Sequence, residues 1–359
     1  MLLDVETTRE DESLLARQLQ ELNDIEDLQS YILPVPKDLS YMAGELQQAT
    51  AMRQQVEQIL FEAWENMRQS RKLDLAPVNR IIADAATFME SHREAMVALI
   101  LLSQRHETTY IHASNVAILL MAFGLSINLS PGQVRLLGLG GLLHDVGITR
   151  IAVNVLKKAG RLTPRERKLM ELHPRLGFEL LDKLAGLSKE VALIALQHHE
   201  RYNGSGYPRK LFRDHIHNFA MMTSIVDTFA AMTVDRSWRE RITPSLALAK
   251  MLTWSQSRFH PELLQQFIRC VGIYPVGTLL RFRNNLVGIV IRQNPQRLLY
   301  PVVRVFFDTD TRLLVPQQVI NLMESQYRNN YEVVSTEIPE KWGLNSQNLV
   351  NEVMGLQGV

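Results

Sequence analysis

The sequence predicts a mainly α-helical protein with a small β-structured region towards its C-terminus. Between about residues 40 and 270, apolar residues recur at spacings of three or four, the period of a helix that is buried on one side. After Gly272 the pattern changes to short apolar runs separated by Asn- and Asp-containing turns, which is typical of antiparallel strands. The chain has 359 residues, of which 46% are hydrophobic and 21% charged, so it can bury a sizeable core.

Charge, cysteine content and hydropathy exclude several classes of protein. The chain has 39 basic and 38 acidic residues, without the basic excess of a protein that binds a nucleic-acid polymer. Its single cysteine, Cys270, excludes an internal disulfide framework and a cysteine-ligated metal cluster. The N-terminus lacks a signal-peptide pattern, and the apolar runs 95–102 and 116–123 are shorter than the ~20 residues that span a bilayer. We therefore expect a cytoplasmic protein without a membrane partner.

The first ninety residues divide into two regions. Residues 1–40 begin with an acidic stretch and are expected to form a variable N-terminal arm. Residues 41–93 show helical spacing and are expected to form an N-terminal helical region, with its second helix at 78–91. These helices could pair with a second copy of the chain in a homodimer, or pack onto the domain that follows. The pattern leaves both alternatives open.

Residues 94–271 form the expected main domain, which is almost entirely helical. Ser130 and Pro131 begin one helix, which ends at His144-Asp145, and Thr163 with Glu166 forms a capping box at the start of another. The other expected helices include 116–123, 191–200, 218–233, 244–251 and 261–267, with a Gly- and Pro-rich loop at 203–208. Strands are expected at 278–282, 287–291, 302–307 and 312–315, within a small β extension over 272–335 that precedes a polar tail over 336–359.

Seven side chains on or beside these helices are candidate metal ligands. They are five imidazoles and two carboxylates: His112, His144, Asp145, His173, His198, His199 and Asp227. This donor set suits iron, manganese, zinc or nickel, and it is too large for one ion. Two ions bridged by Asp145 would lower the pKa of a bridging water and hold phosphate oxygens, which predicts hydrolysis of a phosphoester. The competing interpretation treats each histidine as an ordinary core or surface residue, as we expect for His92, His106, His215, His217 and His260.

The order and spacing of these residues resemble the HD-GYP family, the metal-dependent phosphodiesterases of the HD superfamily that hydrolyse the bacterial messenger cyclic di-GMP. The resemblance is carried by residues 110–116, 141–147, 160–163, 173–174, 198–208 and 226–227. It implies an all-helical HD-superfamily bundle in which the seven candidates hold two divalent ions, iron or manganese. It also implies that a hydroxide bridging this dinuclear centre hydrolyses the 3′–5′ phosphodiester, with Asp145 as the catalytic ligand.

The resemblance further implies a substrate site and a partner. Gly206, Tyr207 and Pro208 would form a loop beside the substrate pocket. Arg236 and Arg239 would contact substrate phosphates, because a guanidinium can donate two hydrogen bonds to one phosphate. Some family members contact a diguanylate cyclase (GGDEF) domain through this loop, which makes such a domain the expected protein partner.

The chain departs from the family pattern at four positions. Thr108 stands where members with three metals have a glutamate, so we expect two metals. Ile148 and Ala230 replace a lysine and an aspartate near the reacting phosphate, and Asn203 replaces an aspartate before the Gly-Tyr-Pro loop.

These departures leave three alternatives open. The chain is a working but slow cyclic di-GMP phosphodiesterase, an inactive member that binds metal or cyclic di-GMP and signals through protein contacts, or a hydrolase of another nucleotide. Retention of all seven ligands favours the enzyme, because an unpaired polar group buried in a helical core costs ~1–3 kcal/mol.

Overall fold

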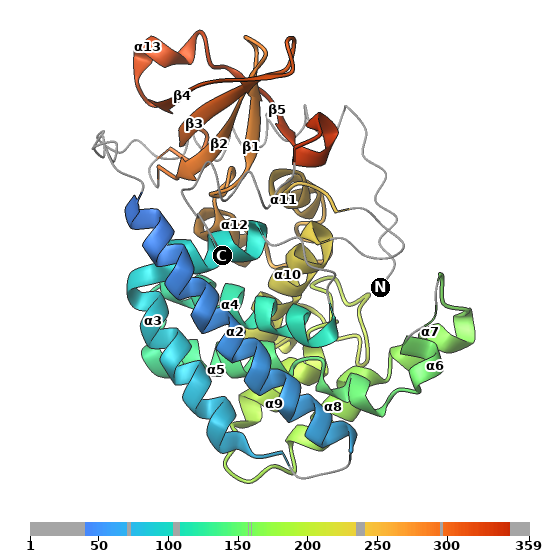
Figure 1. The fold of residues 1–359 in the computed structure, drawn as a ribbon. Helices are drawn as coiled ribbons and strands as arrows, with labels where there is room; N and C mark the ends of the chain where they lie inside the picture. The colour runs from blue at the N-terminus through green and yellow to red at the C-terminus, as the bar shows by residue number, and fades with distance from the viewer. Residues whose placement is uncertain are drawn as a thin grey trace.

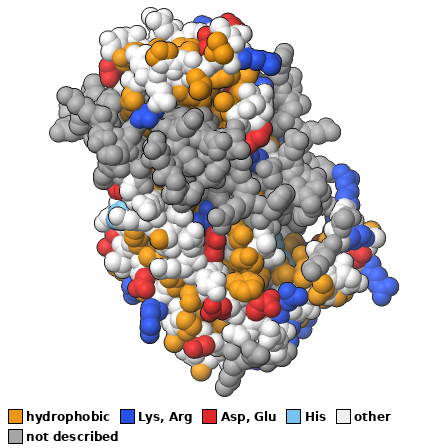
Figure 2. Space-filling model, in the orientation of Figure 1, with side chains coloured by type: hydrophobic (Ala, Val, Ile, Leu, Met, Phe, Trp, Pro, Cys, Tyr) orange, Lys and Arg blue, Asp and Glu red, His pale blue; other side chains and the backbone are white. Residues whose placement is uncertain are grey.

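The computed structural model describes residues 40–69, 73–102, 108–156, 158, 160–234, 241–294 and 297–344. A body of helices carries a five-stranded sheet at one end, coloured orange in Figure 1. Acidic and basic side chains are interspersed on the face of the helical body seen in Figure 2, in keeping with the net charge of +1. The predicted N-terminal arm lies outside the described residues, except for Ser40. The mainly helical fold class is confirmed.

Two long helices begin the described chain. Helix α2 (Ser40–Arg68) packs along α3 (Leu75–Leu102), and α3 departs from helical geometry at His92, where φ is −122° and ψ is 27°. Residues of both helices, such as Val56 and Ile82, belong to the same buried cluster as the main domain. The two helices therefore pack onto the domain that follows, as the second alternative predicts, while a homodimer stays a prediction.

Helix α4 (Thr109–Ser126) lies at the centre of the helical body, and every residue from Ile111 to Gly124 is buried. It contacts α3, α5 (Pro131–Leu143), α10 (Asn218–Thr233) and α12 (Pro261–Val271). In the described part of the chain, α4 alone has the length and apolar composition to cross a membrane, and 72% of that window is buried inside the protein. Its apolar surface is thus covered by neighbouring helices.

Helix α5 approaches its neighbours closely because it carries three glycines in four residues, Gly138, Gly140 and Gly141. A Cβ added to Gly141 would lie 2.5 Å from the Cα of Ala117 on α4, so the two backbones nearly touch. Ser130 caps this helix and Pro131 begins it, as predicted. The close α4–α5 contact brings the C-terminal end of α5, with its His-Asp pair, up to α4.

Shorter elements complete the helical body. The predicted capping box of Thr163 and Glu166 is present at the start of α7, and α10 spans the residues predicted for it. The shorter elements of the helical body are η1 (Val146–Arg150), α6 (Val153–Leu156), α7 (Pro164–Met170), α8 (His173–Leu181), α9 (Lys189–Gln197), η2 (Arg213–His215) and α11 (Pro244–Thr253).

The C-terminal region is an antiparallel sheet with the strand order β4-β3-β2-β1-β5. Its strands are β1 (Leu279–Phe282), β2 (Leu286–Arg292), β3 (Val302–Asp308), β4 (Leu313–Asn321) and β5 (Val333–Glu337), with α13 (Ser325–Arg328) before β5 and η3 (Pro339–Trp342) after it. All four predicted strands are present, but β4 continues to Asn321, beyond the predicted end at 315. Strand β5 was not predicted, because its short sequence lies in a polar stretch and it forms only by pairing with β1, where Glu337 is opposite Leu279.

Candidate metal centre

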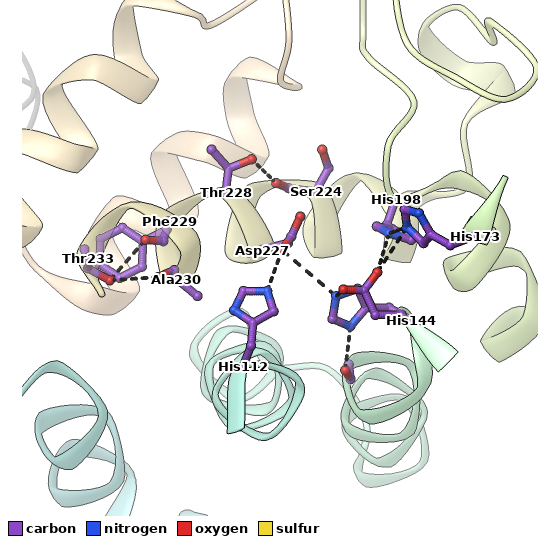
Figure 3. A network of polar contacts seen from close by, with 12 residues as sticks. His112, His144, His173, His198, Ser224, Asp227, Thr228, Phe229, Ala230 and Thr233 are labelled. Atoms are coloured by element: carbon purple, nitrogen blue, oxygen red, sulfur yellow. Dashed lines mark hydrogen bonds and ion pairs between the residues drawn. The ribbon is translucent and has the colours of Figure 1, made fainter. Parts of the chain in front are cut away.

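The seven candidate ligands come from five helical regions that meet at one place. His112 lies on α4, His144 and Asp145 follow α5, His173 begins α8, His198 and His199 follow α9, and Asp227 lies on α10. Figure 3 shows the side chains of His112, His144, His173, His198 and Asp227 pointing toward one another from these elements. The structure therefore brings together residues that are up to 115 positions apart in the sequence.

The candidates form two neighbouring groups. One contains Asp145, His173, His198 and His199, and the other contains His112, His144 and Asp227. Within each group, one possible ligand atom from every residue lies within 4.8 Å of the others. All seven predicted ligands belong to one group or the other, and each group could hold a metal ion.

Asp145 connects the two groups through its two carboxylate oxygens. Its Oδ1 lies 3.1 Å from Nε2 of His173 and 3.4 Å from Nε2 of His198, in the first group. Its Oδ2 lies 3.4 Å from Nε2 of His144, in the second. In that group, Oδ1 of Asp227 lies 2.8 Å from Nε2 of His112. A carboxylate with one oxygen facing each group is suited to bridge two cations.

Backbone carbonyls orient three of the imidazoles. Nδ1 donates to a carbonyl oxygen one turn earlier in each case: His144 to Gly141 at 2.7 Å, His173 to Met170 at 2.7 Å and His198 to Ala195 at 2.9 Å. In the neutral ring the proton is then on Nδ1, and Nε2 presents a lone pair to the centre. Such hydrogen bonds to the second ring nitrogen are typical of histidines that bind metals.

In the described part of the chain, no protein group donates a hydrogen bond to the lone pair of His144. Nε2 of His173 and Nε2 of His198 lie 3.3 Å apart, and two lone pairs cannot form a hydrogen bond with each other. Among the described residues, the fully buried Nε2 of His144 has no hydrogen-bond partner. Buried acceptors of this kind are rare unless an unseen group satisfies them. The residues fit divalent metal ions.

The electrostatics favour the metal-binding protonation states of Asp145, Asp227 and His199, whereas the pKa of His144 is raised, because Asp145 outweighs the effect of burial. Burial alone would raise the pKa of Asp145, but His144, followed by His173 and His198, holds that pKa well below its usual range. Burial would also raise the pKa of Asp227, but the hydrogen bond and charge of His112 lower it. Burial, then the neighbouring imidazoles, lowers the pKa of His199. Charged carboxylates and neutral imidazoles are the forms that coordinate metal.

Gly147 lets η1, which directly follows Asp145, pack closely against α8, which begins with His173. A Cβ at this position would overlap the carbonyl oxygen of His173 and lie 2.5 Å from the backbone nitrogen of Gly177. Helix η1 therefore packs against α8 backbone to backbone, and this contact places Asp145 beside His173. Only glycine fits there.

We expect Gly147→Ala to lower both thermal stability and metal content. The added methyl group must push η1 away from α8, and such overpacking costs about 1–3 kcal/mol. The matched control is Gly132→Ala on α5, where the nearest atom to an added Cβ is 4.0 Å away. Thermal melting and metal analysis of the two variants measure the effect. A Gly147→Ala protein with the melting temperature and metal content of the control would contradict this role.

The Gly-Tyr-Pro loop lies against the metal centre. The backbone N–H of Tyr207 donates to the carbonyl of His199 at 3.2 Å, and the two rings lie 4.8 Å apart. Burial, followed by Asp145 and Asp227, raises the pKa of Tyr207 well above its usual value, so its hydroxyl stays protonated. Gly206 is buried and Pro208 is exposed. Arg236 and Arg239, the predicted phosphate-binding residues, lie outside the described residues.

Glu200 organises this loop, a role that the sequence analysis did not assign. Its side chain is 2% exposed and accepts hydrogen bonds from the backbone N–H groups of Arg209 at 2.6 Å and Leu211 at 3.0 Å. Gly206 packs directly on it, since an added Cβ would lie 2.5 Å from the Cα of Glu200. A carboxylate directly before a Gly-rich loop is the signal that could have indicated this role.

Three of the positions that depart from the family pattern differ in their surroundings. Asn203 accepts a hydrogen bond from the backbone N–H of Ser205 at 3.0 Å, a turn contact that an aspartate could make equally well. Ile148 and Ala230 are buried apolar residues, each three positions after a carboxylate of the metal centre. The change at 203 is therefore conservative, whereas Ile148 and Ala230 are apolar where the family pattern has charged residues.

Comparison with known proteins identifies the family. Residues 71–263, more than half of the chain, match the HD domain family. A Pseudomonas aeruginosa protein named cyclic di-GMP phosphodiesterase PA4108 is 31% identical over 312 residues, which cover 87% of this chain and 74% of the relative. The Xanthomonas campestris response regulator RpfG, also named a cyclic di-GMP phosphodiesterase, is 38% identical over 144 residues, 40% of this chain and 38% of its own length.

Two further relatives extend the comparison. A Vibrio cholerae protein named 3′3′-cGAMP-specific phosphodiesterase 2 is 30% identical over 162 residues, 45% of this chain and 31% of the relative. The solved structure of Bd1817, an HDG"Y"P protein from Bdellovibrio bacteriovorus, is 18% identical, with a TM-score of 0.53 over 72% of this chain and 80% of that one, which shows a shared fold. The chain therefore belongs to the HD domain family, as the resemblance of its sequence predicts.

Proposed function

We propose that this protein is a metal-dependent phosphodiesterase that hydrolyses the cyclic dinucleotide cyclic di-GMP. The observation that carries the proposal is the position of Asp145, whose carboxylate directs one oxygen at each of the two histidine-rich groups. That arrangement suits a dinuclear centre that acts on a phosphodiester. The names of the PA4108 protein and RpfG support cyclic di-GMP as the substrate, and the cGAMP-specific relative supports the wider class of cyclic dinucleotides.

Each part of the site has a role in this proposal. Asp145, His173, His198 and His199 would hold one ion, and His112, His144 and Asp227 the other, with Asp145 shared; iron or manganese suits these donors. When bound, the ions supply an activated water and polarise the phosphate oxygens. The chain's own groups orient the substrate: the protonated hydroxyl of Tyr207 donates a hydrogen bond, and Arg236 and Arg239 bind phosphate.

The alternative is a catalytically weak member that signals through protein contacts. The apolar side chains of Ile148 and Ala230 favour this alternative, because neither can stabilise charge on the reacting phosphate. A diguanylate cyclase domain at the exposed Pro208, and a homodimer, belong to this alternative as proposals.

Hydrolysis of cyclic di-GMP by the purified full chain tests the proposed function. The protein is loaded anaerobically with iron or manganese, and linear pGpG and GMP are separated by chromatography. We expect metal-dependent formation of a linear product, which the same sample loses after chelation. Full metal occupancy without any product would refute the proposed enzymatic activity and favour the alternative, a member that signals through protein contacts.

A further inference from the structure

The chain between the ligands Asp145 and His173 includes a helix that projects from the helical body. This helix is α7, and with the residues around it, 160–172, it forms what we call the α7 segment. Figure 1 shows α6 and α7 (green) standing away from the other helices. No residue of α7 is buried. Because helices in proteins gain most of their stability by packing one face, α7 is suited to receive a partner.

Local contacts fix the shape of the α7 segment. Oε2 of Glu166 accepts hydrogen bonds from the backbone N–H of Thr163 at 2.7 Å and from its hydroxyl at 2.8 Å, and it pairs with Nζ of Lys158 at 2.6 Å. The hydrogen bond of Lys158, followed by those of Thr163, lowers the pKa of Glu166 to about 2. Glu166 is thus charged and engaged at neutral pH, and it does not form an ion pair with the basic residues of α7.

The exposed surface of α7 is both basic and apolar. Arg165, Lys168, Leu169 and Leu172 are all exposed, and their spacing of three and four places them on one side, which we call the α7 face. Leu169 is 42% exposed and Leu172 is 44% exposed. Among the described residues, neither Arg165 nor Lys168 forms an ion pair. Figure 2 shows Lys and Arg side chains at this edge of the molecule.

The N-terminal arm has the complementary pattern. Residues 1–39, which lie outside the described residues, contain ten acidic and three basic residues. Glu12, Leu15, Leu19, Leu22 and Glu26 recur at alternating spacings of three and four. In a helix with this spacing, one side carries three leucines with a carboxylate at each end. That side matches the α7 face in both charge and apolar character.

The N-terminal arm is long enough to reach the α7 face. It joins α2 at Ser40, and α2 contacts η1, which precedes α6 and α7 in the chain. The start of α2 lies no farther from this contact than the length of the helix, ~43 Å for its 29 residues. Residues 151–164 add at most ~50 Å, whereas 39 extended residues span ~130 Å.

We propose that the N-terminal arm of the same chain binds the α7 face through its acidic, leucine-bearing side. Opposite charges attract the two surfaces, and contact between their leucines removes apolar area from water. The contact would place the arm on the stretch of chain that joins Asp145 to His173. It gives a role to the acidic N-terminal residues and to the exposed leucines of α7, which the proposed function leaves without one.

Hydrogen exchange of the full chain, measured by mass spectrometry, tests this contact. It requires no catalytic activity, so its outcome is independent of the proposed function. The variant Glu12→Lys with Glu26→Lys reverses the charge of the arm and leaves the sequence of the α7 segment unchanged. We expect the amides of residues 161–172 to exchange about 5- to 10-fold faster than in wild type, since the attraction of surface ion pairs is lost. Added salt should speed the same amides in wild type by screening.

Two further variants control the comparison. Asp84→Lys with Glu90→Lys makes the same change in net charge at two exposed residues of α3, and should leave exchange in the α7 segment at the wild-type rate. Adding Arg165→Glu and Lys168→Glu to the reversed arm makes the two charges opposite again. This combination should restore slow exchange, after correction for the intrinsic rates of the new sequence. Melting temperatures are measured for all variants.

Three results would overturn the proposal. The first is equal exchange of residues 161–172 in wild type and in Glu12→Lys with Glu26→Lys. The second is protection that grows with protein concentration, which would assign the α7 face to the arm of a second copy. The third is protection that appears only when vesicles containing phosphatidylserine are added, which would assign the face to an anionic membrane surface.

Discussion

Replacing Asp145 with asparagine is expected to lower cyclic di-GMP turnover by about 10³-fold or more. The amide has nearly the shape of the carboxylate, but it removes the negative charge and leaves only one oxygen for the two groups that Asp145 connects. Loss of a single preorganised electrostatic contact typically costs ~10²–10³-fold in rate, and Asp145 faces both proposed ions. The bound metal should fall from two ions per chain to one or none.

Turnover, metal content by mass spectrometry and thermal melting are measured together for this variant. Asp182→Asn, at the exposed C-terminal end of α8, is the matched control and should leave all three quantities unchanged. Asp145→Asn with two ions per chain and turnover within tenfold of wild type would contradict the bridging role.

The double variant Ile148→Lys with Ala230→Asp is expected to raise turnover by about 10²-fold. Each position lies three residues after a carboxylate of the centre, Ile148 on η1 after Asp145 and Ala230 on α10 after Asp227. Residues three apart on a helix share a face, so both new side chains should point to the side of the helix that carries the ligand. A lysine there would stabilise charge on the phosphate, and an aspartate would assist the leaving alkoxide.

The two single variants are the controls for this gain. Ile148 is 8% exposed and Ala230 is 2% exposed, so a charge placed at one position alone is buried without its partner and should lower stability by several kcal/mol. Steady-state kinetics at full metal occupancy, with melting curves for all three variants, provide the comparison. Turnover of the double variant at or below the wild-type value would show that these positions do not limit the rate.

The candidate site could be predicted largely from the sequence because its ligands lie in short local motifs. His144-Asp145 and His198-His199 follow helices whose apolar spacing is clear, and the helix starts at Ser130 and Thr163 carry capping residues that act within one turn. The convergence of these motifs on one centre depends on contacts such as the α4–α5 approach at Gly141, which local patterns do not specify.

Features that depend on pairing between distant segments were not predicted. Strand β5 forms because its backbone pairs with β1, which lies about 50 residues earlier in the sequence. Arg281 of β1 also forms an ion pair with Glu337 of β5, at 3.1 Å. The break of α3 at His92 lies one residue after the predicted end of the helix 78–91, in the polar stretch 90–94. Glu200 gains its role only when the loop folds back and brings the backbone of Arg209 and Leu211 to its carboxylate. Polar residues in loops acquire their partners from tertiary structure.

The metal stoichiometry of the full chain tests the central claim most directly, namely that seven residues form two ion sites joined by Asp145. The metal-free protein is titrated anaerobically with manganese, and bound metal per chain is measured after removal of the excess. We expect two equivalents in wild type, and exchange coupling between the two ions in the electron paramagnetic resonance spectrum. One equivalent or none, or two ions without magnetic coupling, would contradict the account.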